Sequence, residues 1–257
     1  MKEIVIQTDK LCKSFSSGGR QQHVLKNLDL SIYKGGFTVI MGASGSGKST
    51  LLYALSGRER GITILSKNTS VHYGDVKINH LGISDMAVFR RKNCGFVFQQ
   101  IHLLDNMSVL DNVLACGLLV SRDKKAVAAR AKELLGEVGI MKEDWGKFPS
   151  QLSGGEAQRV GIVRALINEP AVIFADEPTG ALNSAFGEQV LNTLSEVNKK
   201  GQSIVVVTHD VKTARRADRV VYLKDGMICG ECRLGTYTSN DMARHEKLNA
   251  FLTEMGW

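Results

Sequence analysis

The sequence has little proline and no long apolar run. Only 3 of its 257 residues are proline, which suits a chain built from regular elements. The longest nearly apolar stretch, Val113 to Val120, is interrupted by Gly117 and falls far short of the ~20 residues that a membrane-spanning helix needs. The N-terminal segment MKEIVIQTDK alternates charged and apolar residues and lacks the apolar centre of a signal peptide. We therefore expect neither a spanning segment nor a secretory leader.

Cysteine is also sparse, and its number is odd. Five cysteines in a chain of this size do not form a disulfide framework. Cys12, Cys94 and Cys116 are expected to be small, buried apolar side chains. Cys229 and Cys232 form a single C-x-x-C pair, and the sequence has no second such pair to complete a zinc site. The pattern therefore favours a structural role for this pair over a metal or redox role.

The overall balance of residues is that of a globular protein. Apolar residues make up 43% and charged residues 23%, which excludes disorder, collagen and a coiled coil as the main description. The formal net charge of +7 is compatible with a nucleotide, acidic lipid head groups or nucleic acid, and selects none of them. Short apolar runs alternate with helical stripes, which predicts an α/β sheet with some parallel strands.

Two regions carry helical patterns without strand patterns. The stretch over about residues 101–158 predicts a helical subdomain inserted in the sheet core. Apolar residues at helical spacing near the end of the chain predict a last helix over about residues 240–255, with Ser239 or Asn240 as its N-cap.

A glycine-rich loop points to phosphate binding. Residues 42 to 49 match G-x-x-x-x-G-K-[ST], with an apolar strand before them and a helical run after them. Backbone N–H groups of such a loop turn towards phosphate oxygens, and the helix directs its positive end at the anion. Lys48 adds a cation near the β and γ phosphates, and the Ser49 hydroxyl is suited to ligate Mg²⁺. An ordinary glycine-rich turn is the alternative, and the flanking strand and helix argue against it. The candidate nucleotide-binding residues are Gly42, Ser44, Gly45, Ser46, Gly47, Lys48, Ser49 and Thr50.

Two acidic residues end a second apolar run. Residues 171 to 177 read Ala-Val-Ile-Phe-Ala-Asp-Glu. A buried strand that ends in Asp176 can place a carboxylate beside the phosphate loop, where it would hold Mg²⁺ directly or through water. Glu177 follows at the strand end, where it can orient or deprotonate an attacking water. A solvated acidic turn is the alternative, which the phosphate loop disfavours.

A third motif indicates the family. Residues 152 to 159 read Leu-Ser-Gly-Gly-Glu-Ala-Gln-Arg, which resembles the signature motif of the ATP-binding-cassette (ABC) ATPases. The order and spacing of the other motifs also resemble that family, from about residue 3 to about residue 232. The resemblance implies an ABC-type P-loop NTPase over residues 1–257, a single nucleotide-binding domain that binds ATP and Mg²⁺. Its mixed sheet core would carry the inserted helical subdomain and an antiparallel β subdomain.

The resemblance also implies roles for single residues. Phe15 stands at the position of the aromatic that stacks on adenine, although a core phenylalanine is the alternative. Gln99 stands at the position of the glutamine that touches Mg²⁺ and the attacking water, with Gln100 as the competing assignment. His209 stands at the position of the switch histidine near the γ-phosphate. The candidate catalytic residues are thus Glu177, His209 and Gln99, and the candidate magnesium ligands are Ser49, Gln99 and Asp176.

The signature motif implies a second nucleotide contact. Ser153, Gly154 and Gly155 precede a helix expected to start near Glu156, and N–H groups at such a start can bind phosphate. In the family these groups bind the nucleotide held by the opposite subunit, so that two ATP molecules are sandwiched in a head-to-tail dimer. Binding and hydrolysis would then close and open the dimer.

Several segments resemble one branch of the family, which includes macrolide exporters, lipoprotein-releasing systems, the cell-division cassette and peptide-antibiotic detoxification systems. The segments are residues 95–100, 102–104, 108–113 and 176–182. The branch implies a separate integral-membrane permease, a place at the cytoplasmic face of the membrane, and export or detoxification of antimicrobial peptide, lipid-linked or lipoprotein cargo.

The alternative is a cassette ATPase that acts in cell division or on nucleic acid. Cassettes of the nucleic-acid type carry a long coiled coil between the phosphate loop and the signature, and here only about a hundred residues separate Lys48 from Ser153. No nucleic acid partner is therefore expected. The intact phosphate loop and acidic strand end also argue against a non-hydrolytic scaffold.

Two features depart from the family pattern. Asn183 stands where the loop that joins the cassettes usually carries Asp. Asn has the same shape as Asp but lacks its charge. The stretch from Arg58 to Tyr73 is longer than usual and is expected to be a surface loop.

Overall fold

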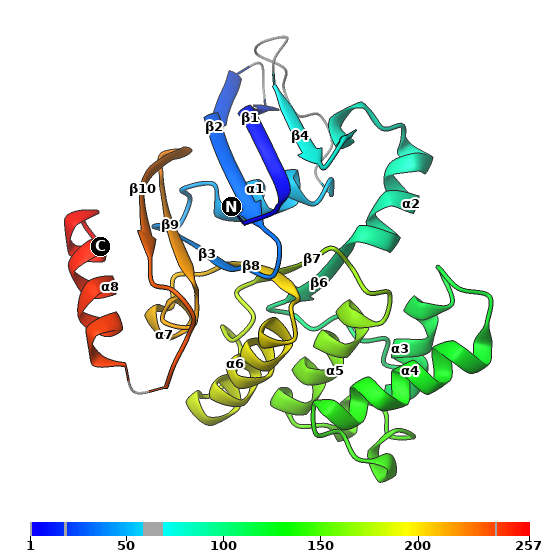
Figure 1. Cartoon of the computed structure of the whole chain (residues 1–257). Coiled ribbons are helices and arrows are strands. Elements are labelled where there is room, and N and C mark those ends of the chain that lie inside the picture. Colours follow the sequence, from blue (N-terminus) through cyan, green and yellow to red (C-terminus); the bar gives the residue numbers. More distant parts are fainter. Residues whose placement is uncertain (1, 18–19, 59–68, 240) are drawn as a thin grey trace.

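The computed structural model describes residues 2–17, 20–58, 69–239 and 241–257, which form two sheets (Figure 1). The antiparallel sheet has the strand order β2-β1-β4-β5 and the mixed sheet has the order β10-β9-β3-β8-β7-β6. The first comprises β1 (Ile4–Ser17), β2 (Arg20–Tyr33), β4 (Ser70–Tyr73) and β5 (Val76–Lys77). The second comprises β3 (Phe37–Met41), β6 (Cys94–Phe98), β7 (Val172–Asp176), β8 (Ser203–Val207), β9 (Arg219–Lys224) and β10 (Met227–Arg233).

The mixed sheet is parallel except at one edge. Strands β3, β6, β7, β8 and β9 pair in parallel, and β10 closes the edge antiparallel to β9. All five residues of β3 and of β8 are buried, as expected for strands covered on both faces. Side chains alternate between the two faces, so Val39 and Met41 join one core while Ile40 joins the other.

Helices cover both faces of this sheet. On the side of the antiparallel sheet lies α1 (Lys48–Leu55), and α2 (Ile83–Asn93) leads into β6. The opposite face packs against α5 (Gly154–Leu166), α6 (Ser184–Lys199) and α8 (Met242–Glu254) (Figure 1). The remaining helices are α3 (Val109–Gly117), α4 (Lys124–Glu137) and α7 (Val211–Ala214), with single 3₁₀ turns at Ile78–His80, Lys142–Asp144 and Pro149–Gln151.

The chain between β6 and β7 is helical. It contains α3, α4 and α5, and no strand lies in residues 99–171, all of which are described. Ser108 caps α3 and Asp123 caps α4, each by accepting hydrogen bonds from main-chain N–H groups of the first turn. Among the residues that the structure describes, no helix is long and apolar enough to cross a membrane.

The last helix is joined by an arginine to the segments that precede β9 and follow β10. Its N-cap is Asp241, whose carboxylate accepts the N–H of Arg244, so Ser239 was the wrong cap residue; Asn240 lies outside the described residues. Leu248 and Leu252 join the core, and the buried guanidinium of Arg244 donates to main-chain oxygens. These oxygens belong to Arg215, Ala217, Leu234, Gly235 and Thr236.

The expected surface loop from Arg58 to Tyr73 is wrong in its last part. Ser70–Tyr73 form β4, which pairs with β1 through Thr8 and Val71. The reason is burial: Val71 and Tyr73 alternate into the core beneath the antiparallel sheet. Residues 59–68 lie outside the described residues.

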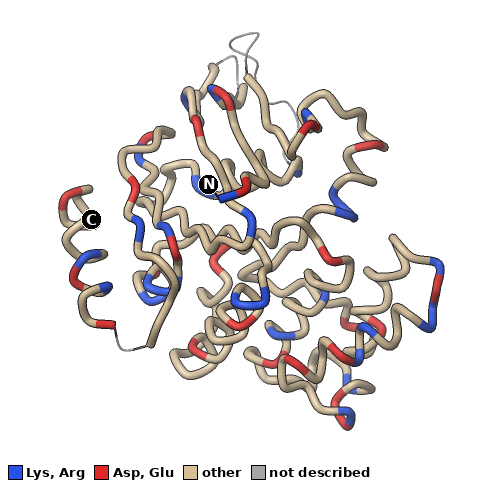
Figure 2. Tube along the Cα trace, viewed as in Figure 1, with Lys and Arg blue, Asp and Glu red and all other residues tan. Residues whose placement is uncertain are grey.

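Basic and acidic residues are interspersed along most elements that the structure describes (Figure 2). The surplus of positive charge is therefore spread over the molecule in this view and does not form a single basic stripe.

The cysteines differ sharply in their surroundings. Cys12 and Cys232 are buried, Cys94 and Cys116 are half-buried, and Cys229 is exposed. Burial raises the pKa of the Cys94 thiol to about 12, and it also raises the pKa of Cys116 and of Cys232. Because the thiolate is the reactive form, a raised pKa protects these side chains from modification.

We predict that a single thiol of the folded protein, that of Cys229, reacts rapidly with Ellman's reagent at pH 8. All five cysteines should react once the protein is unfolded in guanidinium chloride. The matched variant Cys229→Ser should lose the fast phase. A fast phase that survives in this variant would contradict the assignment.

Candidate functional site

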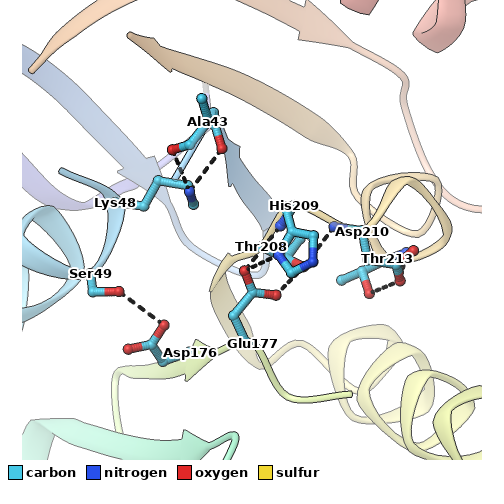
Figure 3. A network of polar contacts seen from close by, with 10 residues as sticks. Ala43, Lys48, Ser49, Asp176, Glu177, Thr208, His209, Asp210 and Thr213 are labelled. Carbon is cyan, nitrogen blue, oxygen red and sulfur yellow. Dashed lines mark hydrogen bonds and ion pairs between the residues drawn. The ribbon is translucent and has the colours of Figure 1, made fainter. Parts of the chain in front are cut away.

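Three loops meet at the carboxyl edge of the mixed sheet. The glycine-rich loop follows β3, Glu177 follows β7, and Thr208 and His209 follow β8 (Figure 3). The three strands end level, since Val207 of β8 pairs with Ile40 on one side and with Asp176 on the other. They border a cavity of about 330 Å³. Its lining residues are Val24, Ser44, Gly45, Gly47, Lys48, Ser49, Thr50, Glu177 and His209.

A larger depression, of about 800 Å³, lies between the antiparallel sheet and the β9–β10 edge. Acidic residues such as Asp9 and Glu231 alternate in its lining with basic residues such as Lys10 and Arg233. This mixture of charges does not converge on one chemistry, whereas the smaller cavity collects a cation, a hydroxyl, a carboxylate and an imidazole. The smaller cavity is therefore the candidate site.

The glycine-rich loop has a backbone that requires glycine. Gly42 has φ +156°, and a Cβ there would lie 2.1 Å from the main-chain oxygen of Leu223. Gly47, with φ +100°, leads directly into α1. The hydroxyl of Ser46 is buried without a hydrogen-bond partner among the described residues. A buried polar atom without a partner is rare in folded proteins and suits a loop that receives a polar ligand.

Lys48 and Ser49 open α1 and point in different directions (Figure 3). The ammonium of Lys48 donates to the main-chain oxygens of Gly42 at 2.8 Å and Ala43 at 2.9 Å. Partial burial lowers the pKa of Lys48, against the opposing effect of the Glu177 and Asp176 carboxylates. The Ser49 hydroxyl donates to Oδ1 of Asp176 at 3.2 Å, so α1 and the end of β7 are joined.

Glu177 is held by the residues that follow β8. Its Oε2 accepts the hydroxyl of Thr208 at 2.7 Å, and its Oε1 accepts the main-chain N–H of His209 at 3.1 Å. The same Oε1 lies 2.7 Å from Nδ1 of His209, which donates if it carries the ring proton. Glu177 has φ +45°, a left-handed conformation that is uncommon outside glycine. This turn directs the carboxylate towards β8, whereas Asp176 faces α1.

Gln99 lies beside the turn after Glu177. A Cβ at Gly180 would be 3.0 Å from Nε2 of Gln99 and 3.5 Å from Cβ of Glu177. The structure thus places the side chain of Gln99 next to the acidic strand end. Both Gln99 and its neighbour Gln100 are exposed.

Phe15 and the Ser153 turn do not line the cavity. Phe15 lies on β1, is 39% exposed, and has the ammonium of Lys13 at 4.9 Å from its ring centroid. Ser153 caps α5: its hydroxyl accepts the N–H of Glu156, and the Glu156 carboxylate accepts the N–H of Ser153. The Ser153 hydroxyl also donates to this carboxylate, and these bonds lower the pKa of Glu156.

The loop from Gly180 to Asn183 packs against this turn. A Cβ at Gly154 would lie 3.0 Å from Leu182, and one at Gly155 would lie 3.0 Å from Phe186. The Asn183 side chain accepts the N–H of Phe186 at 3.0 Å and caps α6. An uncharged amide therefore performs the capping that a carboxylate would otherwise perform.

The sequence analysis missed a buried amide that joins these parts. Gln158 of α5 is 1% exposed, and its Nε2 donates to the main-chain oxygens of Phe98 and Pro178, each at 2.9 Å. These two residues adjoin Gln99 and Glu177. Gln158 stands within the signature motif, but its position gives no sign of partners 60 and 20 residues away. Thr208 and Tyr53 were missed for the same reason. Each donates a hydrogen bond to a carboxylate that is distant in sequence, Thr208 to Glu177 and Tyr53 to Asp176.

Comparisons with known proteins agree with this geometry. The sequence model of the ABC transporter family matches residues 25–180. An uncharacterized ABC transporter ATP-binding protein of Methanocaldococcus jannaschii is 41% identical over 226 residues, covering 87% of this chain and 97% of that protein. The bacitracin export ATP-binding protein BceA of Halalkalibacterium halodurans is 38% identical over 232 residues, covering 90% and 89%.

Other relatives are longer than this chain. A macrolide export ATP-binding/permease protein MacB of Paracoccus denitrificans is 42% identical over 223 residues, which cover 87% of this chain and 32% of that protein. The chain thus spans about a third of the length of the macrolide-export relatives that it matches. Among solved structures, a dimeric ATP-binding cassette in a post-hydrolysis state, bound to ADP and Pi, is similar with a TM-score of 0.79 and 36% identity. The match covers 90% of this chain and 100% of that one.

We predict that Gln158→Met lowers the free energy of unfolding by roughly 2–4 kcal/mol, because it leaves two buried carbonyl oxygens without donors. Urea denaturation followed by circular dichroism measures the change. Gln189→Met is the matched control, since Gln189 is exposed on α6 and the hydrogen bond that it accepts from Arg159 is exposed as well. It should change the stability by less than about 0.5 kcal/mol. Equal losses in both variants would show that the amide of Gln158 is not a structural link.

Proposed function

This chain belongs to the ABC transporter family, and we propose that it is the ATP-binding and ATP-hydrolysing subunit of an exporter whose permease is a separate membrane protein. The fold is the α/β P-loop fold of ABC cassettes, and the chain is an ABC-type ATPase. One observation supports the assignment of the site above all: Lys48, Glu177 and His209 line one cavity, and Asp176 stands beside it. We further propose that residues 1–257 act as one nucleotide-binding domain, with the helices between β6 and β7 as its helical subdomain.

The donor atoms fit a magnesium nucleotide. The loop before α1 supplies N–H groups and the Lys48 ammonium to a polyphosphate. The Ser49 hydroxyl and the Asp176 carboxylate are the hard oxygen donors that Mg²⁺ prefers, and Gln99 adds an amide oxygen. When bound, Mg²⁺ neutralises charge on the phosphate oxygens. Phe15 is proposed to stack on the adenine.

Glu177 is proposed to be the general base. Thr208 is fully buried and its hydroxyl oxygen accepts the N–H of Asp210 at 2.9 Å, so the hydroxyl proton is directed at Glu177. The carboxylate is therefore fixed at the cavity wall, where it can accept the proton of a water that attacks the γ-phosphate. His209 is 69% exposed and contacts Glu177 through Nδ1. Its Nε2 is proposed to face a terminal phosphate, to which it donates when both ring nitrogens carry a proton.

The Ser153 turn is proposed to act on a second copy of the chain. It presents an N-capped helix start that does not border the cavity of its own chain. The N–H groups of Gly154 and Gly155, which the capping bonds do not use, are therefore proposed to bind a nucleotide held elsewhere. A similar solved cassette is dimeric and bound to ADP and Pi. A head-to-tail dimer with two nucleotides between its subunits accounts for both features.

The printed names of the relatives support a proposal for the cargo and the membrane partner. One is named for bacitracin export and others for macrolide export, which supports transport over cell division or a nucleic acid substrate. We propose that the chain is held at the cytoplasmic face of the membrane by a permease. The cargo would be an antimicrobial peptide or a lipid-linked or lipoprotein molecule. Affinity purification with the membrane protein encoded next to it would test the partnership.

We predict that Glu177→Gln slows ATP hydrolysis by roughly 10²–10⁴-fold, since the amide cannot accept the proton, and leaves ATP affinity unchanged. A phosphate-release assay and calorimetry measure the two quantities. The control is Glu196→Gln on α6, where both Glu196 and its partner Lys199 are exposed, and it should hydrolyse ATP like the original protein. Turnover in Glu177→Gln equal to that of the original protein would refute the role of the base.

We predict that saturating ATP with Mg²⁺ converts the Glu177→Gln variant from monomer to dimer in light scattering. Adding Ser153→Arg should prevent this, because the side chain blocks the turn that receives the neighbour's nucleotide, and should leave ATP affinity unchanged. Adding Lys48→Ala should prevent it by abolishing tight ATP binding. If the Glu177→Gln variant, without a second substitution, stays monomeric while calorimetry shows that it is saturated with ATP, the result would argue against the sandwich.

A further inference from the structure

Both oxygens of the Asp176 carboxylate are engaged by the same helix. Ser49 donates to Oδ1, and the phenol of Tyr53 donates to Oδ2 at 2.9 Å. Ser49 and Tyr53 are four residues apart on α1, so their side chains lie on the same face of the helix, one turn from each other. The end of β7 lies against that face. Ser49 belongs to the phosphate-loop motif, whereas Tyr53 lies beyond it and has no role in the function proposed above.

The ring of Tyr53 is held from its other side by Arg58. The guanidinium of Arg58 lies 4.9 Å from the ring centroid of Tyr53 and 4.7 Å from that of Phe98. Phe98 pairs with Asp176 in the parallel ladder and directly precedes Gln99. A cation over two aromatic faces is attracted to both, which restrains the phenol relative to the ends of β6 and β7. The hydroxyl of Tyr53 is thus aimed at Asp176 by packing as well as by its own hydrogen bond.

We propose that Tyr53 is a positioning residue for the metal. Its phenol orients the Asp176 carboxylate, and the nucleotide complex therefore binds Mg²⁺ more tightly than it would without this hydrogen bond. The proposal rests on the assignment of Asp176 and Ser49 to the metal made above. Hydrogen bonds from outer residues to ligating carboxylates fix the ligand's orientation, and their loss typically weakens metal binding about 10–100-fold. A purely structural phenol would instead affect stability alone.

The chain offers a matched control for that distinction. Tyr73 also presents a phenol to the region of α1, where its hydroxyl donates to the main-chain oxygen of Leu55 at 2.9 Å. Tyr73→Phe removes a hydrogen bond of similar length near the other end of the helix, together with a 3.6 Å contact with Sγ of Cys94, and leaves Asp176 untouched. Comparing Tyr53→Phe with Tyr73→Phe therefore separates an effect on the metal from an effect on folding.

The experiment measures metal binding without turnover. ADP affinity is determined by calorimetry in EDTA and at a series of free Mg²⁺ concentrations, and Mn²⁺ binding to the ADP complex is followed by electron paramagnetic resonance. We expect Tyr53→Phe to raise the half-saturating concentration of either metal about 10-fold and to leave ADP affinity in EDTA unchanged. Tyr73→Phe should lower the melting temperature and leave the metal titration where it is. Arg58→Gln, at an exposed position, should shift the titration in the same direction as Tyr53→Phe but less.

A double-mutant cycle assigns the effect to Asp176. In the Asp176→Asn background, Tyr53→Phe should produce no further shift of the metal titration. A titration that is unchanged in both Tyr53→Phe and Arg58→Gln, or a shift that persists in the Asp176→Asn background, would overturn the role of Tyr53. If the original protein binds ADP equally well with and without Mg²⁺, the metal site itself is wrongly placed. That result is distinguishable, because it appears before any variant is compared.

Discussion

Parallel pairing of β3, β8 and β7 brings three chemically different segments to one edge of the sheet. Ile40, Val207 and Asp176 stand level across the three strands. The loop after β3, the acid after β7 and the hydroxyl and imidazole after β8 therefore reach the same cavity. The pairing involves strands that are buried on both faces, so the site is built on the buried centre of the mixed sheet. A shift of one residue in this register would separate Glu177 from Thr208 and His209.

The backbone at the end of β7 places the two neighbouring acids, Asp176 and Glu177, in different surroundings. Asp176 is the last residue of β7 and faces the hydroxyls of Ser49 and Tyr53 on α1. Glu177 leaves the strand with a positive φ and turns to Thr208 and His209. Consecutive strand residues point to opposite sides, and the left-handed turn completes the separation. One carboxylate is thereby suited to a metal and the next to a proton.

Features of this chain differ in how far the sequence reveals them. Local sequence patterns predict three features: the phosphate loop, the acidic strand end and the last helix. The structure contains a turn, a strand end and a helix at those positions. The strand at Ser70–Tyr73 was not predicted because its local pattern is short and weak. Its pairing with β1, which the sequence does not reveal, stabilises it. Tyr53 and Gln158 could not be found from the spacing of residues in the sequence. The partner of Tyr53 lies 123 residues away and those of Gln158 lie 60 and 20 residues away, and the folded sheet brings each pair into contact. Local patterns predict elements, whereas the contacts between elements need the fold.

The contact of Lys48 with its own loop bears on which anions the protein accepts. An anion that draws the ammonium away from the oxygens of Gly42 and Ala43 must replace two hydrogen bonds of 2.8 and 2.9 Å. A small anion with a single charge makes fewer contacts with which to compensate for that loss. A chain of phosphates can offer oxygens to the lysine and to the helix start at the same time. Under the proposed function, the loop would therefore favour an anion that makes several contacts at once over one that makes few.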